Sequence, residues 1–258
     1  MARSIPAPDG RCSLSGNRAE IFGVALDLLT MDETLARCVE LIEERRPVQH
    51  VVINAGKVVM MEDIPALRQI IAGCDVVNAD GQSIVWAGRA LGHAVPERVA
   101  GIDLMHRLLA EAARRGWPVY FLGARQEVVE TCVAQIVERN PGLVIAGVRN
   151  GYFSDDAAIA HEVRLSGAQL LFVGISSPRK EEFLAAQLRE MGPVFAMGVG
   201  GSFDVVAGLT QRAPLWMQRS GLEWFYRFLQ EPGRMWKRYL VGNARFLTIV
   251  LREWQDGR

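Results

Sequence analysis

One carboxylate in the sequence stands at a strand-to-helix junction, in the stretch Asn78-Ala79-Asp80-Gly81-Gln82. The apolar run CDVVNA ends there and a helix-like run begins. An Asp at such a junction is most often the N-cap of the following helix. If its carboxylate faces a pocket instead, it can accept a proton from a hydroxyl group held by Asn54, which ends the preceding strand in the same manner. The local sequence leaves the two roles open.

Four further strand ends carry polar or glycine-rich turns, at 53–56, 121–124, 174–178 and 198–202. Ligands of open α/β sheets bind at the carboxyl ends of the strands. Five such turns on one edge, with that of Asp80, predict a pocket of phosphate or nucleotide size. Each turn alone is equally typical of an ordinary strand-to-helix connection.

The stretch GVGGSFD is the strongest nucleotide-binding candidate, because its glycines let backbone amides approach an anion. It lacks the third glycine of GxGxxG, and the sequence contains nothing like GxxxxGK[ST]. A dinucleotide-binding dehydrogenase or a P-loop enzyme is therefore disfavoured.

Charge is unevenly distributed along the chain. Residues 1–210 hold 20 basic and 25 acidic side chains, whereas residues 211–258 hold nine basic and four acidic ones and four of the six tryptophans. A basic, aromatic, helical tail indicates a surface for anionic lipid, although composition alone favours a solvated helical face with an aromatic core seam. Single-stranded nucleic acid is the competing partner, but the acidic body would repel a long phosphate backbone. Arg98 could clamp a diphosphate or form a surface salt bridge.

Short apolar strands alternate with helices up to about residue 201, which predicts a mostly parallel sheet with helices on both faces. We expect a poorly ordered segment over 1–20, an α/β catalytic core over 21–210 and a helical appendage over 211–258. The predicted strands are 22–29, 50–55, 74–79, 118–124, one within 143–153, 168–175 and 193–200; the predicted helices are 31–46, 56–72, 81–92, 101–115, 127–139, 155–165 and 178–191.

The four cysteines and four histidines are scattered, so the sequence predicts reduced thiols, a cytoplasmic protein, and neither a metal site nor a cofactor. It contains no run of ~18 uncharged apolar residues that would span a membrane.

An ordered set of motifs resembles the WecG/TagA/CpsF glycosyltransferases from about residue 22 to about 240. The resemblance implies a Rossmann-like core with a C-terminal appendage that contacts the membrane. It also implies inverting transfer of a sugar from a nucleotide donor to a sugar on a polyprenyl diphosphate, with no metal. The motifs are Asn54, NADG (78–81), RVAGIDL (98–104), FLGA (121–124), NGYF (150–153), VGISSPRKEEF (173–183), GVGGSFDVVAG (198–208) and RAPLWMQRSGLEWFYRFLQEP (212–232).

The resemblance assigns roles to individual residues. Asp80 matches the general base. Nucleotide contacts are expected at the glycine-rich strand ends, namely Gly123, Gly174, Gly198, Gly200, Gly201 and Asp204. Substrate contacts are expected at Asn54, Asn78, Arg98 and Lys180, with Arg227, Arg234 and Lys237 of the appendage near the acceptor's diphosphate.

Three positions depart from the family pattern: Val52 stands where Thr is frequent, Lys180 where Gln is usual, and Lys237 where Arg is expected. The first two fall where a sugar would be recognised, so a neutral hexose donor such as glucose is plausible.

The sequence therefore predicts a hexosyltransferase at the inner face of the cell membrane. It would use UDP-hexose or UDP-N-acetylhexosamine to form a β-linked, lipid-linked disaccharide for exopolysaccharide or cell-envelope glycan. The alternatives are an oxidoreductase with a nucleotide cofactor and a nucleic-acid-binding protein.

Overall fold

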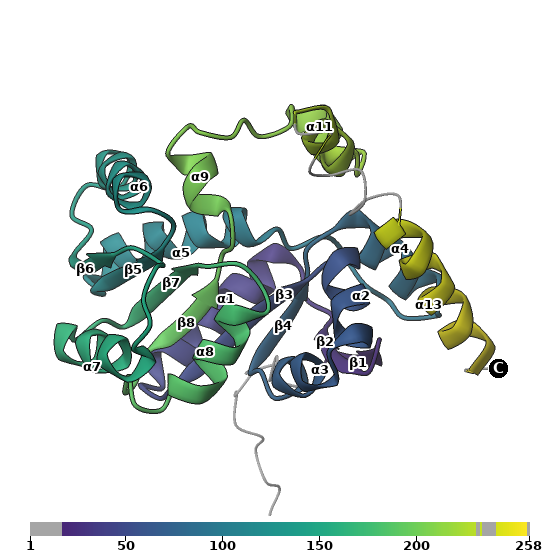
Figure 1. Ribbon diagram of the computed structural model, residues 1–258, viewed down its shortest axis with the longest axis horizontal. Coiled ribbons are helices and arrows are strands. Elements are labelled where there is room, and N and C mark those ends of the chain that lie inside the picture. The colour runs from purple at the N-terminus through teal and green to yellow at the C-terminus, as the bar shows by residue number, and fades with distance from the viewer. Residues whose placement is uncertain (1–16, 231–232, 234–240, 257–258) are drawn as a thin grey trace, which may run out of the picture.

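The computed structural model describes residues 17–230, 233 and 241–256 (Figure 1). Residues 1–16, for which the sequence predicts poor order, lie outside this part. Residues 18–20 of the same predicted segment belong to a strand. None of the described helices combines the length and apolar character needed to cross a membrane.

The centre of the molecule is a sheet of six parallel strands in the order β4-β3-β8-β7-β5-β6. This confirms the predicted Rossmann-like α/β core. Five of these strands are short apolar runs buried at almost every residue, as strands covered on both faces must be. The strands are β3 (Val48–Ile53), β4 (Val76–Ala79), β5 (Val119–Gly123), β6 (Ile145–Arg149), β7 (Leu170–Gly174) and β8 (Phe195–Gly198).

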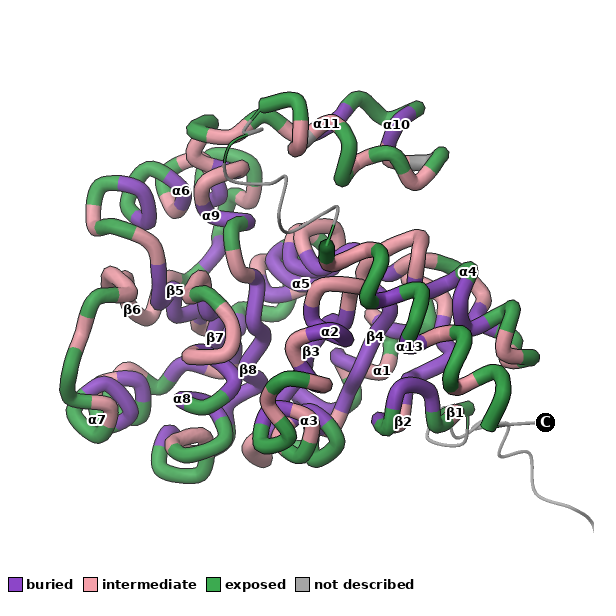
Figure 2. Tube along the Cα trace, turned by 45° about the vertical axis from the view of Figure 1, so that its right-hand side comes forward, coloured by how far each residue is buried: buried purple, intermediate pink, exposed green. Residues whose placement is uncertain are grey.

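Helices cover both faces of the sheet (Figure 2). Phe121 and Phe172 point to one face, where they pack with Leu108 of α5 and with residues of α1, α6 and α9. Leu122 points to the other face and packs with Phe183 of α8 and with α7. The helices are α1 (Met31–Glu43), α4 (Gln82–Ala90), α5 (Gly101–Arg115), α6 (Gln126–Arg139), α7 (Asp156–Ser166), α8 (Arg179–Gln187), α9 (Ser202–Val206), α10 (Leu215–Arg219) and α11 (Glu223–Gln230).

Two predicted elements are divided in the structure. The predicted strand 22–29 is part of an antiparallel hairpin, β1 (Arg18–Ile21) and β2 (Val24–Asp27), because Gly23 adopts a positive φ of 70° at the turn. The predicted helix 56–72 is two helices, α2 (Ala55–Asp63) and α3 (Pro65–Ala72). Pro65 cannot occupy the interior of a helix, and it disfavours helical backbone dihedral angles at the preceding residue, Ile64.

The last helix, α13 (Gly242–Asp256), packs on the core. Phe246 is buried against Phe22, with ring centroids 5.6 Å apart, and Glu253 Oε1 accepts a 2.7 Å hydrogen bond from the Phe22 backbone N–H. Arg245 forms an ion pair with Asp63 of α2. Although residues 211–258 are predicted as one appendage, their final helix completes the hydrophobic core around β1, β2 and α2.

Replacement of Phe246 by Ala is expected to destabilise the protein by about 3 kcal/mol or more, because it opens a cavity beside Phe22. The adjacent Leu247 is 60% exposed, so its replacement by Ala is a matched control that should cost less than about 0.5 kcal/mol. Urea unfolding of both variants measures the difference. Equal losses would show that α13 is not part of the core.

Candidate active site

The predicted pocket residues Asn54 and Asp80 follow the neighbouring strands β3 and β4. The Asp80 backbone N–H donates a 2.8 Å hydrogen bond to Ile53 O, which ties the second turn to the first. A Cβ added at Gly81 would lie 3.6 Å from Asn54 Cβ, so the two turns are in contact. The sequence-based prediction that these turns are neighbours is confirmed.

The two turns use their polar side chains differently. Asn54 is the N-cap of α2, and its Oδ1 accepts a 3.0 Å hydrogen bond from the Lys57 backbone N–H. The N-cap of α4 is Gly81, and this helix has no side-chain cap hydrogen bond. Asp80 is therefore not the cap of the helix that follows it, and the more common explanation for an Asp at this junction does not apply.

Asn78 is fully buried beneath the same edge. Its Oδ1 lies 3.0 Å from His50 Nε2, and its Nδ2 donates to Thr34 Oγ1 at 3.2 Å. Burial lowers the pKa of His50 to about 4, so the imidazole is neutral and the network is uncharged at neutral pH. Asn78 links β3, β4 and α1, and the structure does not bring its amide to the carboxyl edge.

A chain of ion pairs lies beside Asp80 and connects the core to the segment after α9. Arg212 donates to both carboxylate oxygens of Asp103, at 2.6 and 2.7 Å, and Arg98 donates to Glu223 at 2.7 Å. The hydrogen bonds to Asp103 raise the pKa of Arg212, and the negative charges of Asp103, Glu223 and Asp80 add to this effect. Asp80 is thus within electrostatic range of a fixed guanidinium.

The α10–α11 segment also packs on the helix that follows Asp80. In Figures 1 and 2 it lies above α4 and α5. A Cβ added at Gly221, between α10 and α11, would come within 2.8 Å of Gln82 and 3.2 Å of Trp86. This contact and the Arg98–Glu223 pair hold the start of α11 close to the helix that follows the Asp80 turn.

A second charged cluster joins α2 to α8 near the ends of β3 and β8. Lys57 Nζ and Lys180 Nζ lie 2.7 and 2.8 Å from Glu181 Oε1, and all three side chains are at most 7% exposed. Ser177 Oγ lies 2.6 Å from Lys180 Nζ and 3.0 Å from Glu181 Oε1. Gly198 makes room for the lysine stem, because a Cβ there would lie 2.5 Å from Lys180 Cε.

Protonation within this cluster is strongly perturbed. Burial opposes ionisation of Glu181, but the ammonium groups of Lys57 and Lys180 outweigh it and lower the pKa of Glu181 to about 2. Burial and the neighbouring Lys57 charge lower the pKa of Lys180 to about 8. At neutral pH the cluster therefore carries two cations and one anion, and has a net positive charge.

Among the glycine turns predicted to hold a nucleotide, those at the ends of β5 and β7 are close-packed, whereas the turn after β8 is more open. A Cβ on Gly123 would lie 2.5 Å from the Gly174 backbone, and one on Gly174 would lie 2.4 Å from the Phe203 ring. Gly200 has a positive φ of 53°, and nothing lies within 4 Å of the position where its Cβ would stand. Gly201 precedes α9, and the Asp204 carbonyl accepts hydrogen bonds from Leu209 and Thr210.

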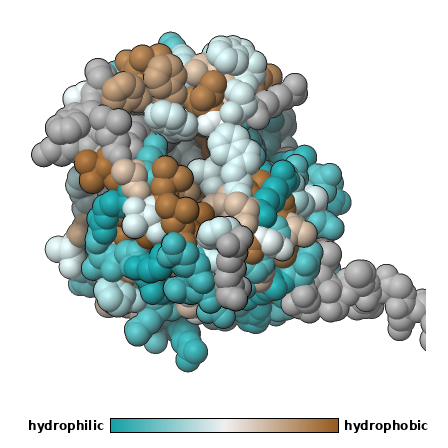
Figure 3. Space-filling view, turned by 90° about the vertical axis from the view of Figure 1, so that its right-hand side faces the viewer, coloured by the Kyte–Doolittle hydropathy of each residue, from teal (hydrophilic) through white to brown (hydrophobic). Residues whose placement is uncertain are grey.

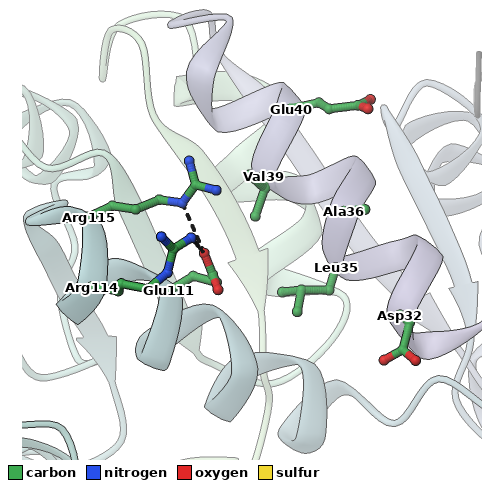
Figure 4. A pocket seen from close by; sticks show the side chains of 8 residues that line it. All are labelled: Asp32, Leu35, Ala36, Val39, Glu40, Glu111, Arg114 and Arg115. Carbon is green, nitrogen blue, oxygen red and sulfur yellow. Dashed lines mark hydrogen bonds and ion pairs between the residues drawn. The ribbon is translucent and has the colours of Figure 1, made fainter. Parts of the chain in front are cut away.

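The remaining predicted contacts are only partly described. Arg227 belongs to α11, while Arg234 and Lys237 lie outside the described residues. A hollow of about 410 Å³ between α1 and α5 is lined by none of the predicted site residues (Figure 4). Glu111 at its rim pairs with Arg114 and Arg115. In the part of the chain that the structure describes, no three His, Cys, Asp or Glu side chains form a group that could hold a metal ion.

Four charged residues at this edge were missed as site residues in the sequence: Lys57, Glu181, Arg212 and Glu223. The last three lie within motifs that were recognised, and Lys57 lies three residues after Asn54. Their sequence context gave no signal of their partners, since Lys57 and Glu181 are 124 residues apart and Arg98 and Glu223 are 125 apart.

The parallel sheet flanked by helices defines a Rossmann-like α/β protein, a class whose ligands bind at the carboxyl edge of the sheet. The chain belongs to the WecG/TagA/CpsF family of glycosyl transferases, whose family model matches residues 19–258. It is similar to the N-acetylglucosaminyldiphosphoundecaprenol N-acetyl-beta-D-mannosaminyltransferase of Bacillus subtilis (strain 168), at 32% identity over 71% of this chain and 72% of the relative. The protein of the same name from Bacillus spizizenii is also 32% identical, over 73% of this chain and 72% of the relative. The chain is therefore a glycosyltransferase, and the predicted enzyme class, a hexosyltransferase, is confirmed.

Replacement of Glu181 by Gln is expected to destabilise the protein by about 3 kcal/mol or more, because two buried ammonium groups lose their counterion. Replacement of Lys180 by Met should change stability by less than about 1 kcal/mol, since Lys57 still balances Glu181 and an apolar chain of similar length fills the site. Urea unfolding at pH 7 measures both. A Met variant that is the less stable of the two would contradict this charge balance.

The same cluster predicts a pH dependence. Between about pH 8 and 10.5 the unfolded chain still binds the Lys180 proton while the folded protein has lost it, so stability gains a contribution that grows with pH. The wild-type protein should therefore gain stability relative to the Lys180→Met variant between pH 8 and pH 10. A constant difference over that range would show that the pKa of Lys180 is not lowered.

Proposed function

We propose that this protein transfers a sugar from a nucleotide donor to a sugar carried on a polyprenyl diphosphate, with inversion at the anomeric carbon. The donor is a UDP-hexose or UDP-N-acetylhexosamine, and the product is a β-linked, lipid-linked disaccharide for exopolysaccharide or cell-envelope glycan. Both Bacillus relatives are named for an N-acetylglucosaminyldiphosphoundecaprenol, which supports this class of substrate.

The observation that carries the proposal is the placement of Asp80. Its turn contacts that of Asn54 at the carboxyl edge, it does not cap its own helix, and two arginines lie nearby on Asp103 and Glu223. A carboxylate held at a ligand edge in this way is suited to accept a proton.

The reaction follows as a single displacement. The acceptor hydroxyl oxygen attacks the anomeric carbon from the face opposite the nucleotide while Asp80 accepts the hydroxyl proton. The bond from the anomeric carbon to the nucleotide's phosphate oxygen breaks, and its electron pair leaves with the nucleoside diphosphate. The backbone amides of Gly200 and Gly201, after β8, are suited to bind that anion, and the net positive Lys57–Glu181–Lys180 cluster packs against Gly198 at the end of the same strand.

The acceptor reaches this edge from the inner leaflet of the cytoplasmic membrane. Hydrophobic side chains gather at the top of the molecule, where α10 and α11 lie (Figure 3). Leu215, Trp216 and Leu229 are 60% or more exposed there. An apolar surface of this kind, on a segment that contacts the Asp80 turn, would place a membrane-held acceptor at the catalytic edge.

Replacement of Asp80 by Asn should lower turnover by about 10² or more, in the range expected when a general base is lost, with little change in stability. Asp63→Asn is the matched control, since Asp63 pairs with Arg245 on the exposed side of α2 and should leave turnover unchanged. The assay offers UDP-glucose, UDP-N-acetylmannosamine, UDP-N-acetylmannosaminuronate and GDP-mannose with short prenyl-diphosphate sugars and follows product mass. Near-normal turnover of the Asn variant would exclude Asp80 as the base, and no product with any donor would exclude the function.

Replacement of Trp216 and Leu229 by Ser should weaken binding to vesicles that contain anionic lipid, because it removes apolar area from α10 and α11. The control replaces Leu247 and Leu251 by Ser, which are equally exposed but lie on α13. Co-sedimentation with vesicles compares the two. If the α13 variant loses vesicle binding and the α10–α11 variant retains it, the surface that docks on the membrane lies on α13.

A further inference from the structure

Two arginines from distant parts of the chain lie on either side of one carboxylate next to the Asp80 turn. Arg98 Nη1 donates to Glu223 Oε2 at 2.7 Å, and Arg212 Nε lies 3.8 Å from Glu223 Oε1. The side chains of Arg98, Arg212 and Glu223 are 15%, 23% and 23% exposed. These three side chains are thus partly buried, and charge-assisted hydrogen bonds from the guanidinium groups to an anion between them are strong.

The carboxylate does not satisfy both arginines. Both terminal nitrogens of Arg212 donate to Asp103, which leaves Nε for the Glu223 side. That Nε is buried and has no hydrogen-bond partner among the described residues, because 3.8 Å exceeds hydrogen-bond distance. A phosphate group has more acceptor oxygens and more charge than a carboxylate, and can accept from Arg98 and from Arg212 Nε together.

Charge balance decides how such a group would enter. With Glu223 in place, the carboxylates of Asp103 and Glu223 balance the charges of Arg98 and Arg212, and Glu223 stands between the two guanidinium groups. When Glu223 withdraws, these two cations face one carboxylate, and Arg98 loses this counterion. An incoming anion must therefore replace Glu223 instead of adding to it.

We propose that Arg98 and Arg212 form a seat for a diphosphate group, which Glu223 occupies in the ligand-free protein and leaves when the diphosphate binds. The identity of the ligand rests on the proposed function, in which both donor and acceptor carry a diphosphate. Arg98 was expected to bind substrate; Arg212 and Glu223 are added by the structure.

The replacement of Glu223 by the diphosphate couples ligand binding to the position of α11. Glu223 is the first residue of that helix, and the neighbouring Trp224 and Phe225 are 42% and 39% exposed. Loss of the Arg98–Glu223 pair removes the ionic link that holds the start of α11 to the core. Diphosphate binding then frees α11 to move while Arg212 remains held by Asp103.

Calorimetric titration with inorganic pyrophosphate tests the seat in the full-length chain. Replacement of Glu223 by Gln keeps the shape of the side chain and removes the competing charge, so this variant should bind pyrophosphate at least several-fold more tightly than wild type. Arg212→Gln should bind it several-fold more weakly. Glu111→Gln is the control, since it takes a carboxylate from an arginine pair elsewhere and should leave affinity unchanged. Equal or weaker binding by the Glu223 variant would overturn the proposal.

A measurement on the wild-type protein guards against misfolded variants. Pyrophosphate should accelerate backbone hydrogen exchange at residues 223–226, because α11 loses its ion pair with Arg98. Slower hydrogen exchange there would contradict the displacement of Glu223 by the diphosphate. Competition by UDP or by farnesyl diphosphate then shows whether the donor or the acceptor supplies the group. Failure of every donor in the transfer assay would refute the proposed function but would leave the pyrophosphate result unaffected. Unchanged pyrophosphate affinity in the Glu223 variant would refute the diphosphate site even if the enzyme were active.

Discussion

The pairing of β3 with β8 joins the two halves of the sheet, and the ligand edge depends on it. Within the sheet, three residue pairs, from Val48 with Phe195 to His50 with Met197, join β3–β4 to the other four strands. Beyond the last pair the two strand ends continue toward the carboxyl edge, where the Lys57–Glu181 ion pair connects α2 to α8. The junction is thus made by backbone hydrogen bonds within the sheet, by the hydrophobic core that covers it and by a buried ion pair at its edge, and it brings the Asn54 turn beside the glycine-rich turn of β8.

This construction separates two kinds of charge at one edge. The Lys57–Glu181–Lys180 cluster is almost completely buried, so its net positive charge is weakly screened and fixed in position. The pairs of Arg98 and Arg212 are partly exposed, and they join the core to a segment that follows α9. The first arrangement suits a preorganised field for a leaving group. The second can exchange partners at lower cost, because water solvates the groups that separate.

The sequence predicted the elements well where periodicity and breakers act locally, and less well where tertiary contacts decide. The alternating strands and helices and the neighbouring Asn54 and Asp80 turns follow from such local signals. The hairpin at Gly23 and the break at Ile64 were missed, although Gly and Pro signal both. The core contacts of α13 and the ion-pair partners of Arg98 and Lys57 could not be predicted, because they join residues more than 120 positions apart. Asn78 shares its strand-end context with Asp80, but it lies within β4, where its amide group bonds to His50 and Thr34, whereas Asp80 follows the end of the strand.

The departures from the family pattern gain a physical meaning at the same edge. Val52 is buried, and a Cβ added at Gly101 would lie 3.6 Å from its methyl group, so packing fills the place where a threonine hydroxyl would stand. Lys180 donates to Ser177 and pairs with Glu181, so a sugar hydroxyl would compete with internal partners for its ammonium. Under the proposed function, recognition of the donor then depends more on charge and shape than on side-chain hydrogen bonds from these two positions.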